Sequence, residues 1–241
     1  MALKETFENQ GNFLFRYRGH IPIFFLLLAI PFAFLGKSND LFYLNFVISL
    51  ICIIAGHLVR ARTVGRRELH TSGRNRSQQV ASRLNTKGWY SMVRHPLYFG
   101  NFLIWLGLAF FLENYYLILI LCLLFWLYYE RIMFAEEQFL ERKFGSNFLS
   151  WSNNVPAFFP NFSKFQASEN LFSWRIVFKN EYPGVLSTMT SFLFLVIIKR
   201  TALNSGFSIQ LTDFYFALFI LVFGLTFKVL KKYTKVFFEM D

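Results

Sequence analysis

Residues 95–144 of this chain read HPLYFG NFLIWLGLAF FLENYYLILI LCLLFWLYYE RIMFAEEQFL ERKF, and this stretch decides the fold class. It holds two apolar runs, residues 97–112 and 115–134, joined by a very short connection. Because a transmembrane helix needs about 20 mostly apolar residues, the pair predicts a helical hairpin that crosses a bilayer twice. The helical pattern continues beyond the second run to Phe144, and Gly145 is placed to end the helix. Such a helix would be about 45 Å long and would project roughly 15 Å beyond a ~30 Å hydrocarbon core.

Four further apolar stretches flank this hairpin, at residues 21–36, 41–59, 185–198 and 214–230. Together with the hairpin they predict an all-α, multi-pass integral membrane bundle of about six transmembrane helices. The composition agrees, because 55% of the 241 residues are hydrophobic and only 16% are charged, against roughly 25% charged in an average soluble domain. A soluble domain of this length could not hide 34 Phe side chains in one core.

The basic residues predict the orientation of the bundle. The net charge is +11, and with six spans and a cytoplasmic N-terminus, 22 of the 25 Lys and Arg residues lie on one side. Only Lys37, Lys199 and Arg200 lie on the other side. Since cytoplasmic loops collect basic residues, both termini are expected to be cytoplasmic. Orientation therefore explains most of the charge. Without a basic module interleaved with aromatic residues, a nucleic-acid partner is not expected.

Polar chemistry concentrates just before the third apolar run. Pro96 keeps His95 out of helical geometry and favours a helix that begins at position 96. His95 is thereby placed near the N-cap with Arg94 beside it, where free backbone N–H groups and the helix dipole attract an anion such as a carboxylate. A lone histidine before a proline is also common as a purely structural feature, and the segment alone leaves both interpretations open.

A second polar group lies on the projecting part of the helix that follows the fourth run. Glu136 and Glu137 are expected where this helix leaves the membrane. One interpretation is a solvated helix face whose acids pair with basic residues one turn later. The other is a functional pair of carboxylates facing the His95 segment. Neither Cys52 nor Cys122 belongs to a disulfide or zinc spacing, and no metal site is predicted.

Taken together, the two segments resemble the isoprenylcysteine carboxyl methyltransferase and phospholipid methyltransferase superfamily. The pattern covers residues 84–160 and reads Gly88-x-Tyr90-x3-Arg94-His95-Pro96-x-Tyr98-x-Gly100, an apolar hairpin, Glu136-Glu137-x2-Leu140-x3-Phe144-Gly145, and Phe148-x2-Trp151-x3-Val155-Pro156-x2-Phe159-Pro160. Membrane steroid and sterol reductases share the first piece, but they typically have Asn and Glu where this chain has Leu97 and Asn101. The paired glutamates favour the methyltransferases. Phe148 and Trp151 stand where family members usually have two tyrosines.

The resemblance implies S-adenosylmethionine as the cofactor, bound on the cytoplasmic side, and a lipid or lipid-linked acceptor with a carboxylate, phosphate or amine. It implies a catalytic set of Arg131, Glu136 and Glu137, in which Arg131 holds the substrate. The cofactor-binding candidates are Tyr90, Arg94, His95, Pro96, Leu97, Tyr98, Gly100 and Glu136. Two alternatives remain at this point: an NADPH-dependent membrane reductase, and a non-catalytic membrane protein of the same fold.

Three parts are expected along the chain. Residues 1–83 form two transmembrane helices and a basic cytoplasmic loop, and residues 84–160 form the methyltransferase-like core. Residues 161–241 add a short interfacial helix near residues 168–179 and two more spans, which either pack or enclose a lipid acceptor. The sequence predicts membrane lipids as neighbours and does not predict an oligomeric state.

Overall fold

The computed structural model describes residues 2–36, 41–66, 79, 81–204 and 206–234. These residues form the α-helices α1 (Leu3–Tyr17), α2 (Ile21–Leu35), α3 (Phe42–Gly65), α4 (Pro96–Phe111), α5 (Tyr115–Phe144), α6 (Ser146–Ser152), α7 (Trp174–Leu203) and α8 (Leu211–Tyr233). Within this described part there is no strand, and a single β-bridge joins Gly88 to Gln166. The predicted all-α class is therefore confirmed.

The number of candidate membrane spans is smaller than the six expected. Four described helices, α3, α5, α7 and α8, are long and apolar enough to cross a bilayer. A fifth span is possible if the N-terminal helix pair, bent by 67°, counts as one broken span. The shortfall has a physical reason, since α2 has 15 residues and α4 has 16. At 1.5 Å per residue each reaches only about 24 Å, less than the ~30 Å of a hydrocarbon core.

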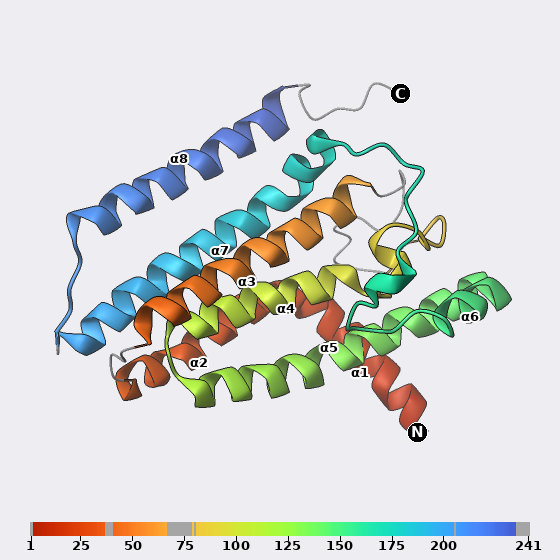
Figure 1. Cartoon of the computed structure of the whole chain (residues 1–241), viewed down its shortest axis with the longest axis horizontal. Helices are drawn as coiled ribbons and strands as arrows, with labels where there is room; N and C mark the ends of the chain where they lie inside the picture. The colour runs from red at the N-terminus through yellow and green to blue at the C-terminus, as the bar shows by residue number, and fades with distance from the viewer. Residues whose placement is uncertain (1, 37–40, 67–78, 80, 205, 235–241) are drawn as a thin grey trace.

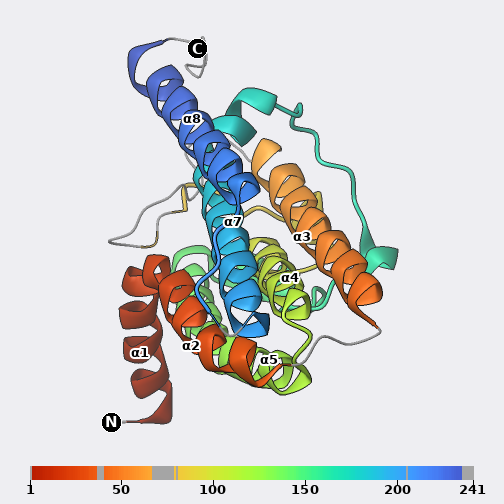
Figure 2. The ribbon, with the colours of Figure 1, turned by 90° about the vertical axis from the view of Figure 1, so that its left-hand side faces the viewer.

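The helices α3, α4, α7 and α8 run roughly along one long axis, whereas α1 lies at a steep angle to it (Figure 1). Figure 1 shows α3, α4 and α7 side by side, with the start of α1, the start of α4 and the end of α8 at the same end of the molecule. Figure 2, which faces one end of this axis, places α8 at the rim beyond α7 and α1 at the opposite rim. The molecule is thus a multi-pass helical bundle with two distinct ends.

Two boundaries test the sequence predictions most directly. The long helix of the hairpin spans Tyr115–Phe144 as expected, and Gly145 ends it with φ +54°. The short interfacial helix expected near residues 168–179 is wrong, because from Trp174 onward the chain continues without a break as α7. Ser173 caps this long helix by accepting a hydrogen bond from the Ile176 N–H, so the interfacial aromatic residues open the span instead of preceding it.

Small residues bring α3 and α4 into close contact. A Cβ added to Gly56 would lie 2.6 Å from the Gly100 carbonyl oxygen, and one added to Gly107 would lie 2.6 Å from the Ser49 carbonyl oxygen. Glycine at such positions allows membrane helices to pack backbone against backbone. This contact fixes the register of α4, and with it the position of the segment that precedes α4.

Charged pairs close the end of the bundle opposite to the start of α4. Lys199 at the end of α7 pairs with the buried Glu113 and donates to the Phe111 carbonyl oxygen at 2.9 Å. The neighbouring Arg200 pairs with the buried Asp213 at the start of α8. Both described basic residues predicted for the outer face are therefore neutralised within the protein, whereas Lys37 lies outside the described residues.

At the other end, α1 packs on the projecting part of α5. A Cβ on Gly11 would lie 2.0 Å from the Arg131 carbonyl oxygen. The Arg142 guanidinium donates to both carboxylate oxygens of Glu8, at 2.6 and 3.0 Å. This amphipathic N-terminal helix was not predicted, and it supports the stretch of α5 that carries the glutamate pair.

We predict that Gly56→Ala destabilises the bundle. Its methyl group would collide with the backbone of α4, and overpacking of this kind costs about 1–3 kcal/mol. The measurement is the midpoint of thermal unfolding of the purified protein in detergent. The matched control is Gly19→Ala, because a Cβ at Gly19 meets nothing within 4 Å. Equal midpoints for the two variants would show that the close α3–α4 contact is absent.

Candidate functional site

The segment before α4 is held in an extended turn by residues that follow α6. His95 has φ −123° and ψ 62° and occupies the N-cap, and Pro96 is the first helical residue, as predicted. The Arg94 N–H donates to the Pro156 carbonyl oxygen at 2.9 Å, and the His95 N–H donates to that of Ala157 at 3.3 Å. These two bonds hold the backbone that leads into the first turn of α4.

A tight turn precedes this segment and fixes its start. Gly88 has φ +65°, a conformation that glycine adopts without steric cost. Its N–H donates to the Gln166 carbonyl oxygen at 2.8 Å, and the Trp151 indole donates to the Tyr90 carbonyl oxygen at 3.1 Å. The tryptophan that replaces a family tyrosine therefore supports the backbone of the site through its indole N–H.

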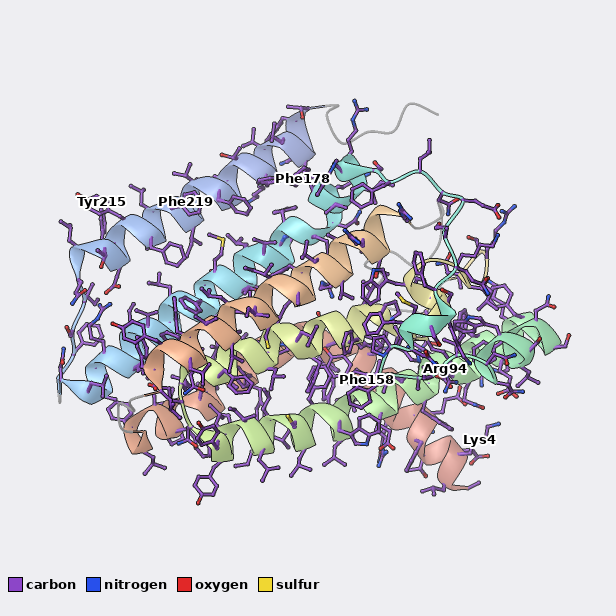
Figure 3. All side chains as sticks on the ribbon, viewed as in Figure 1. Lys4, Arg94, Phe158, Phe178, Tyr215 and Phe219 are labelled. Atoms are coloured by element: carbon purple, nitrogen blue, oxygen red, sulfur yellow. The ribbon has the colours of Figure 1, made fainter. Side chains whose placement is uncertain are left out.

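The two glutamates of α5 meet the start of α4 in one hydrogen-bonded cluster. Arg94 Nη1 donates to Glu137 Oε2 at 2.7 Å, and His95 Nε2 lies 2.8 Å from Glu137 Oε1. The Tyr98 hydroxyl donates to Glu136 Oε1 at 2.7 Å, and His95 Nδ1 lies 3.4 Å from Glu136 Oε2. Figure 3 labels Arg94 where the start of α4 approaches α5. The interpretation of the glutamates as a solvated face is excluded.

His95 is the centre of this cluster. It is 6% exposed and has a carboxylate on each side of its ring. Burial lowers the pKa of His95, but the hydrogen bonds and the negative charges of Glu136 and Glu137 outweigh burial, so the pKa is raised above its usual value. A protonated His95 can donate to both carboxylates at once, which is the arrangement that the distances favour.

The cluster lines a cavity of about 370 Å³, within the range of small-molecule sites. Eight of the predicted site residues lie on its wall: Tyr90, Arg94, His95, Pro96, Leu97, Tyr98, Glu136 and Glu137. Gly100 has a different place, because a Cβ there would lie 2.6 Å from Cγ of Arg60 on α3. Its role in this structure is helix packing.

Arg131 lies away from the cluster. Its guanidinium pairs with Glu130 at 2.7 Å, contacts Gln10 at 3.3 Å and stacks 3.6 Å from the centre of the Phe7 ring. These partners place it against α1, so the structure does not support the predicted contact of Arg131 with a substrate. The five-residue spacing to Glu136 is the reason, since it turns Arg131 to a different face of α5 from Glu136.

Further polar residues of the cavity wall were not selected by sequence reasoning, among them Arg60, Asn101 and Glu181. Arg60 of α3 pairs with Glu181 of α7 through two bonds of 2.7 and 2.9 Å, and it also donates to the Asn101 side chain at 2.6 Å. A charge at the end of an apolar stretch was a usable signal for Arg60. Glu181 gave none, because only the fold brings α7 beside α3.

The wall has the chemical groups that S-adenosylmethionine requires. That cofactor carries a carboxylate, an ammonium and a positive sulfur. Arg94 Nε is buried without a hydrogen-bond partner among the described residues, so an anionic group could use it. Glu136 and Glu137 offer acceptors for cationic groups, and Tyr90, Phe148 and Trp151 add aromatic surface. Within the described ranges, no group of three His, Cys, Asp or Glu residues could hold a metal ion.

We predict that His95 contributes a pH-dependent part of the stability. Since its folded-state pKa is raised above about 6.5, the stabilisation is complete below that pH and is lost as the pH rises through the raised value. The gap in unfolding midpoint between the wild type and His95→Asn should therefore be larger at pH 6 than at pH 9. His20→Asn, at an exposed histidine, is the control. A gap that does not change with pH would mean that His95 is neutral in the fold.

Comparison with known proteins agrees with this geometry. The family model described as phospholipid methyltransferase matches residues 44–147, which contain nearly all of α3, the whole of α4 and α5, and the cluster. No solved structure matches the chain.

Three curated relatives are similar over part of the chain. The nickel-cobalt-cadmium resistance protein NccN of Alcaligenes xylosoxydans xylosoxydans is 39% identical over 50% of this chain and 55% of its own length. The cobalt-zinc-cadmium resistance protein CzcN of Cupriavidus metallidurans is 32% identical over 64% and 69%. The protein-S-isoprenylcysteine O-methyltransferase of Schizosaccharomyces pombe is 30% identical over 49% and 53%. The chain thus spans about half to two thirds of these relatives, and it belongs to the phospholipid methyltransferase family.

Proposed function

We propose that this protein is an S-adenosylmethionine-dependent integral-membrane methyltransferase that acts on a lipid or lipid-linked acceptor at the cytoplasmic face. The observation that carries the proposal is the hydrogen-bonded cluster of His95, Glu136 and Glu137. This cluster lies on the wall of a cavity at the N-terminal end of α4. Family membership and the chemical fit of Arg94 and the glutamates support the choice of cofactor.

The chain's own residues would bind and orient the reactants. When bound, S-adenosylmethionine would supply a methyl group on a positive sulfur, so that a bond from the acceptor lone pair to the methyl carbon would form as the carbon–sulfur bond breaks and the neutral thioether leaves. The Arg94 side chain, with its unused Nε donor, would hold the cofactor carboxylate. Glu136 has room for a further hydrogen bond and would hold an ammonium or a ribose hydroxyl. Correct positioning of two reactants is worth roughly 7–11 kcal/mol of the barrier.

His95 and Tyr98 would keep the glutamates in place. Each carboxylate is oriented by its bonds to these side chains, at 2.7 and 2.8 Å. The protonated ring of His95 also compensates two adjacent negative charges inside a buried site. This pre-organised arrangement would bind a cationic group without rearrangement of the protein.

The cytoplasmic location follows from the charge distribution. Lys199 and Arg200 are paired with Glu113 and Asp213 at the far end, and the remaining described Lys and Arg residues belong to segments at the end with the cavity. The starts of α1 and α4 and the end of α8 lie at that end (Figure 1). By the positive-inside rule this end faces the cytoplasm.

We predict that membranes containing the protein transfer labelled methyl from S-adenosylmethionine to a product that extracts into organic solvent. Glu136→Gln and His95→Ala should each reduce the transfer on the order of 100-fold, because misplacement by about 1 Å costs that much. The control is Glu141→Gln, whose side chain contacts Gln138 and does not line the cavity. Full transfer by Glu136→Gln would overturn the site. Saturable NADPH binding without S-adenosylmethionine binding would indicate the reductase instead.

The names of two relatives favour a second, physiological candidate, a role in resistance to nickel, cobalt, zinc or cadmium. We predict that expression in a metal-sensitive bacterium raises the tolerated metal concentration, and that Glu136→Gln abolishes the gain. Growth against metal concentration is the measurement, with equal membrane levels confirmed by immunoblot. A full gain with Glu136→Gln would separate resistance from methyl transfer.

A further inference from the structure

The cavity extends beyond the cluster into the membrane part of the bundle. Its wall follows one face of α4 and one face of α7, in the positions that recur every three to four residues. These wall residues are Leu97, Asn101, Ile104, Trp105 and Leu108 of α4, and Glu181, Gly184, Ser187, Thr188 and Ser191 of α7. From Leu97 to Leu108 the wall is roughly 16 Å long. We call this part the α4–α7 groove.

The α4–α7 groove has room for a ligand beside Gly184, near its middle. A Cβ built on Gly184 would meet a single atom within 4 Å, Oε2 of Glu181 at 3.8 Å. Apart from Asn101 the α4 side is apolar, and apart from Glu181 the α7 side has small residues that do not fill the gap. A narrow space of this kind, next to hydrocarbon, suits one lipid chain.

A buried ion pair between Arg60 and Glu181 lies at one end of the α4–α7 groove. Neither residue bonds to the cluster of His95, Glu136 and Glu137. The side chains of Arg60 and Glu181 are 16% and 8% exposed. Arg60 donates to Glu181 through Nε and Nη2, and to Asn101 and the Leu97 carbonyl oxygen through Nη1. Buried ion pairs add little to stability, and ionisable groups inside a membrane protein are functional candidates by default.

The ion pair lies on the same cavity wall as the cluster but at a separate place. Asn101 connects the two, because its amide donates to the Tyr129 hydroxyl at 3.3 Å, and the Tyr129 ring lies 4.8 Å from that of Tyr98. A cofactor held at Glu136 would therefore leave the Arg60 end for a second molecule. Glu181 lies outside the residues matched by the family model, whereas Arg60 and Asn101 lie within them.

The pair also selects the chemistry of its ligand. Because Glu181 neutralises Arg60, the site offers no net positive charge to an anion. It presents a guanidinium N–H beside carboxylate lone pairs, so its ligand must both accept and donate hydrogen bonds. A neutral lipid amine or a hydroxyl does so, whereas a protonated amine offers only donors, and a carboxylate or a fully ionised phosphate offers only lone pairs and faces the Glu181 charge.

We infer that Arg60 and Glu181 bind the head of the acceptor lipid, that this head is an amine or a hydroxyl, and that its chain lies in the α4–α7 groove. The inference rests on the proposed function and adds no chemical step to it. It replaces Arg131 as the substrate-holding residue by a pair on α3 and α7.

The first experiment measures binding without catalysis. Purified wild type in mixed micelles is irradiated with a phosphatidylethanolamine that carries a diazirine on one acyl chain, and the labelled peptides are identified by mass spectrometry. We expect label on α4 and α7 around Asn101 and Ser187, and a loss of about tenfold in Gly184→Leu, whose side chain fills the groove. Gly19→Leu is the control. Label elsewhere, or label unchanged in Gly184→Leu, overturns the groove assignment.

The second experiment measures methyl transfer to defined lipids, namely phosphatidylethanolamine, diacylglycerol, oleic acid and phosphatidic acid. We expect methylation of the amine or hydroxyl lipid, and a KM for that lipid raised about tenfold by Glu181→Gln, as for one lost hydrogen bond to a charged group. The dissociation constant for S-adenosylmethionine should not change. Asp213→Asn, at a buried ion pair remote from the cavity, is the control.

The outcomes separate the inference from the proposed function. Methylation of oleic acid or phosphatidic acid, or an unchanged KM in Glu181→Gln, overturns the inference and leaves the methyltransferase intact. No methylation of membranes or of any lipid, together with no S-adenosylmethionine binding, removes the proposed function, while the photolabel still reports whether the α4–α7 groove holds a lipid.

Discussion

The meeting of His95 with two carboxylates of α5 is the constraint on which the rest of the structure depends. His95 is the N-cap of α4, the first helix of the hairpin, and Glu136 and Glu137 lie in α5, the second. The contact between them therefore depends on the lengths of α4 and α5. Removing one residue from α5 would rotate both glutamates by about 100° away from the histidine. The spacing between the motifs is therefore as important as the motifs themselves, and the close α3–α4 packing at Gly56 and Gly100 serves to hold it.

The same dependence explains how much of the site the sequence predicted. Local patterns were sufficient for the hairpin, for the end of α5 at Gly145 and for the N-cap at His95, because these features are determined by neighbouring residues. The contact of His95 with Glu136 came only from a family resemblance. This contact forms only if the 40 residues between His95 and Glu136 fold as a hairpin. The hydrophobic periodicity of the sequence alone does not establish such a hairpin.

The errors have a common physical cause. Arg131 was proposed from the family resemblance, yet helical rotation and the N-terminal helix turn it toward Phe7 and Gln10. Arg60 and Glu181 were passed over because nothing local connects them, although they form a tight buried pair. Helix faces and long-range contacts are decided by the whole bundle, and a single sequence reports them poorly.

Neighbouring segments bury the start of α4. The far end of α4 is fixed where Lys199 pairs with Glu113 and donates to the Phe111 carbonyl oxygen. At the near end Arg60 of α3 lies against Gly100, and the segment that follows α6 accepts hydrogen bonds from the Arg94 and His95 N–H groups. His95 is consequently buried although it precedes the helix. In the proposed function, this covered position lets the head of a lipid meet polar groups while its chain remains among the helices.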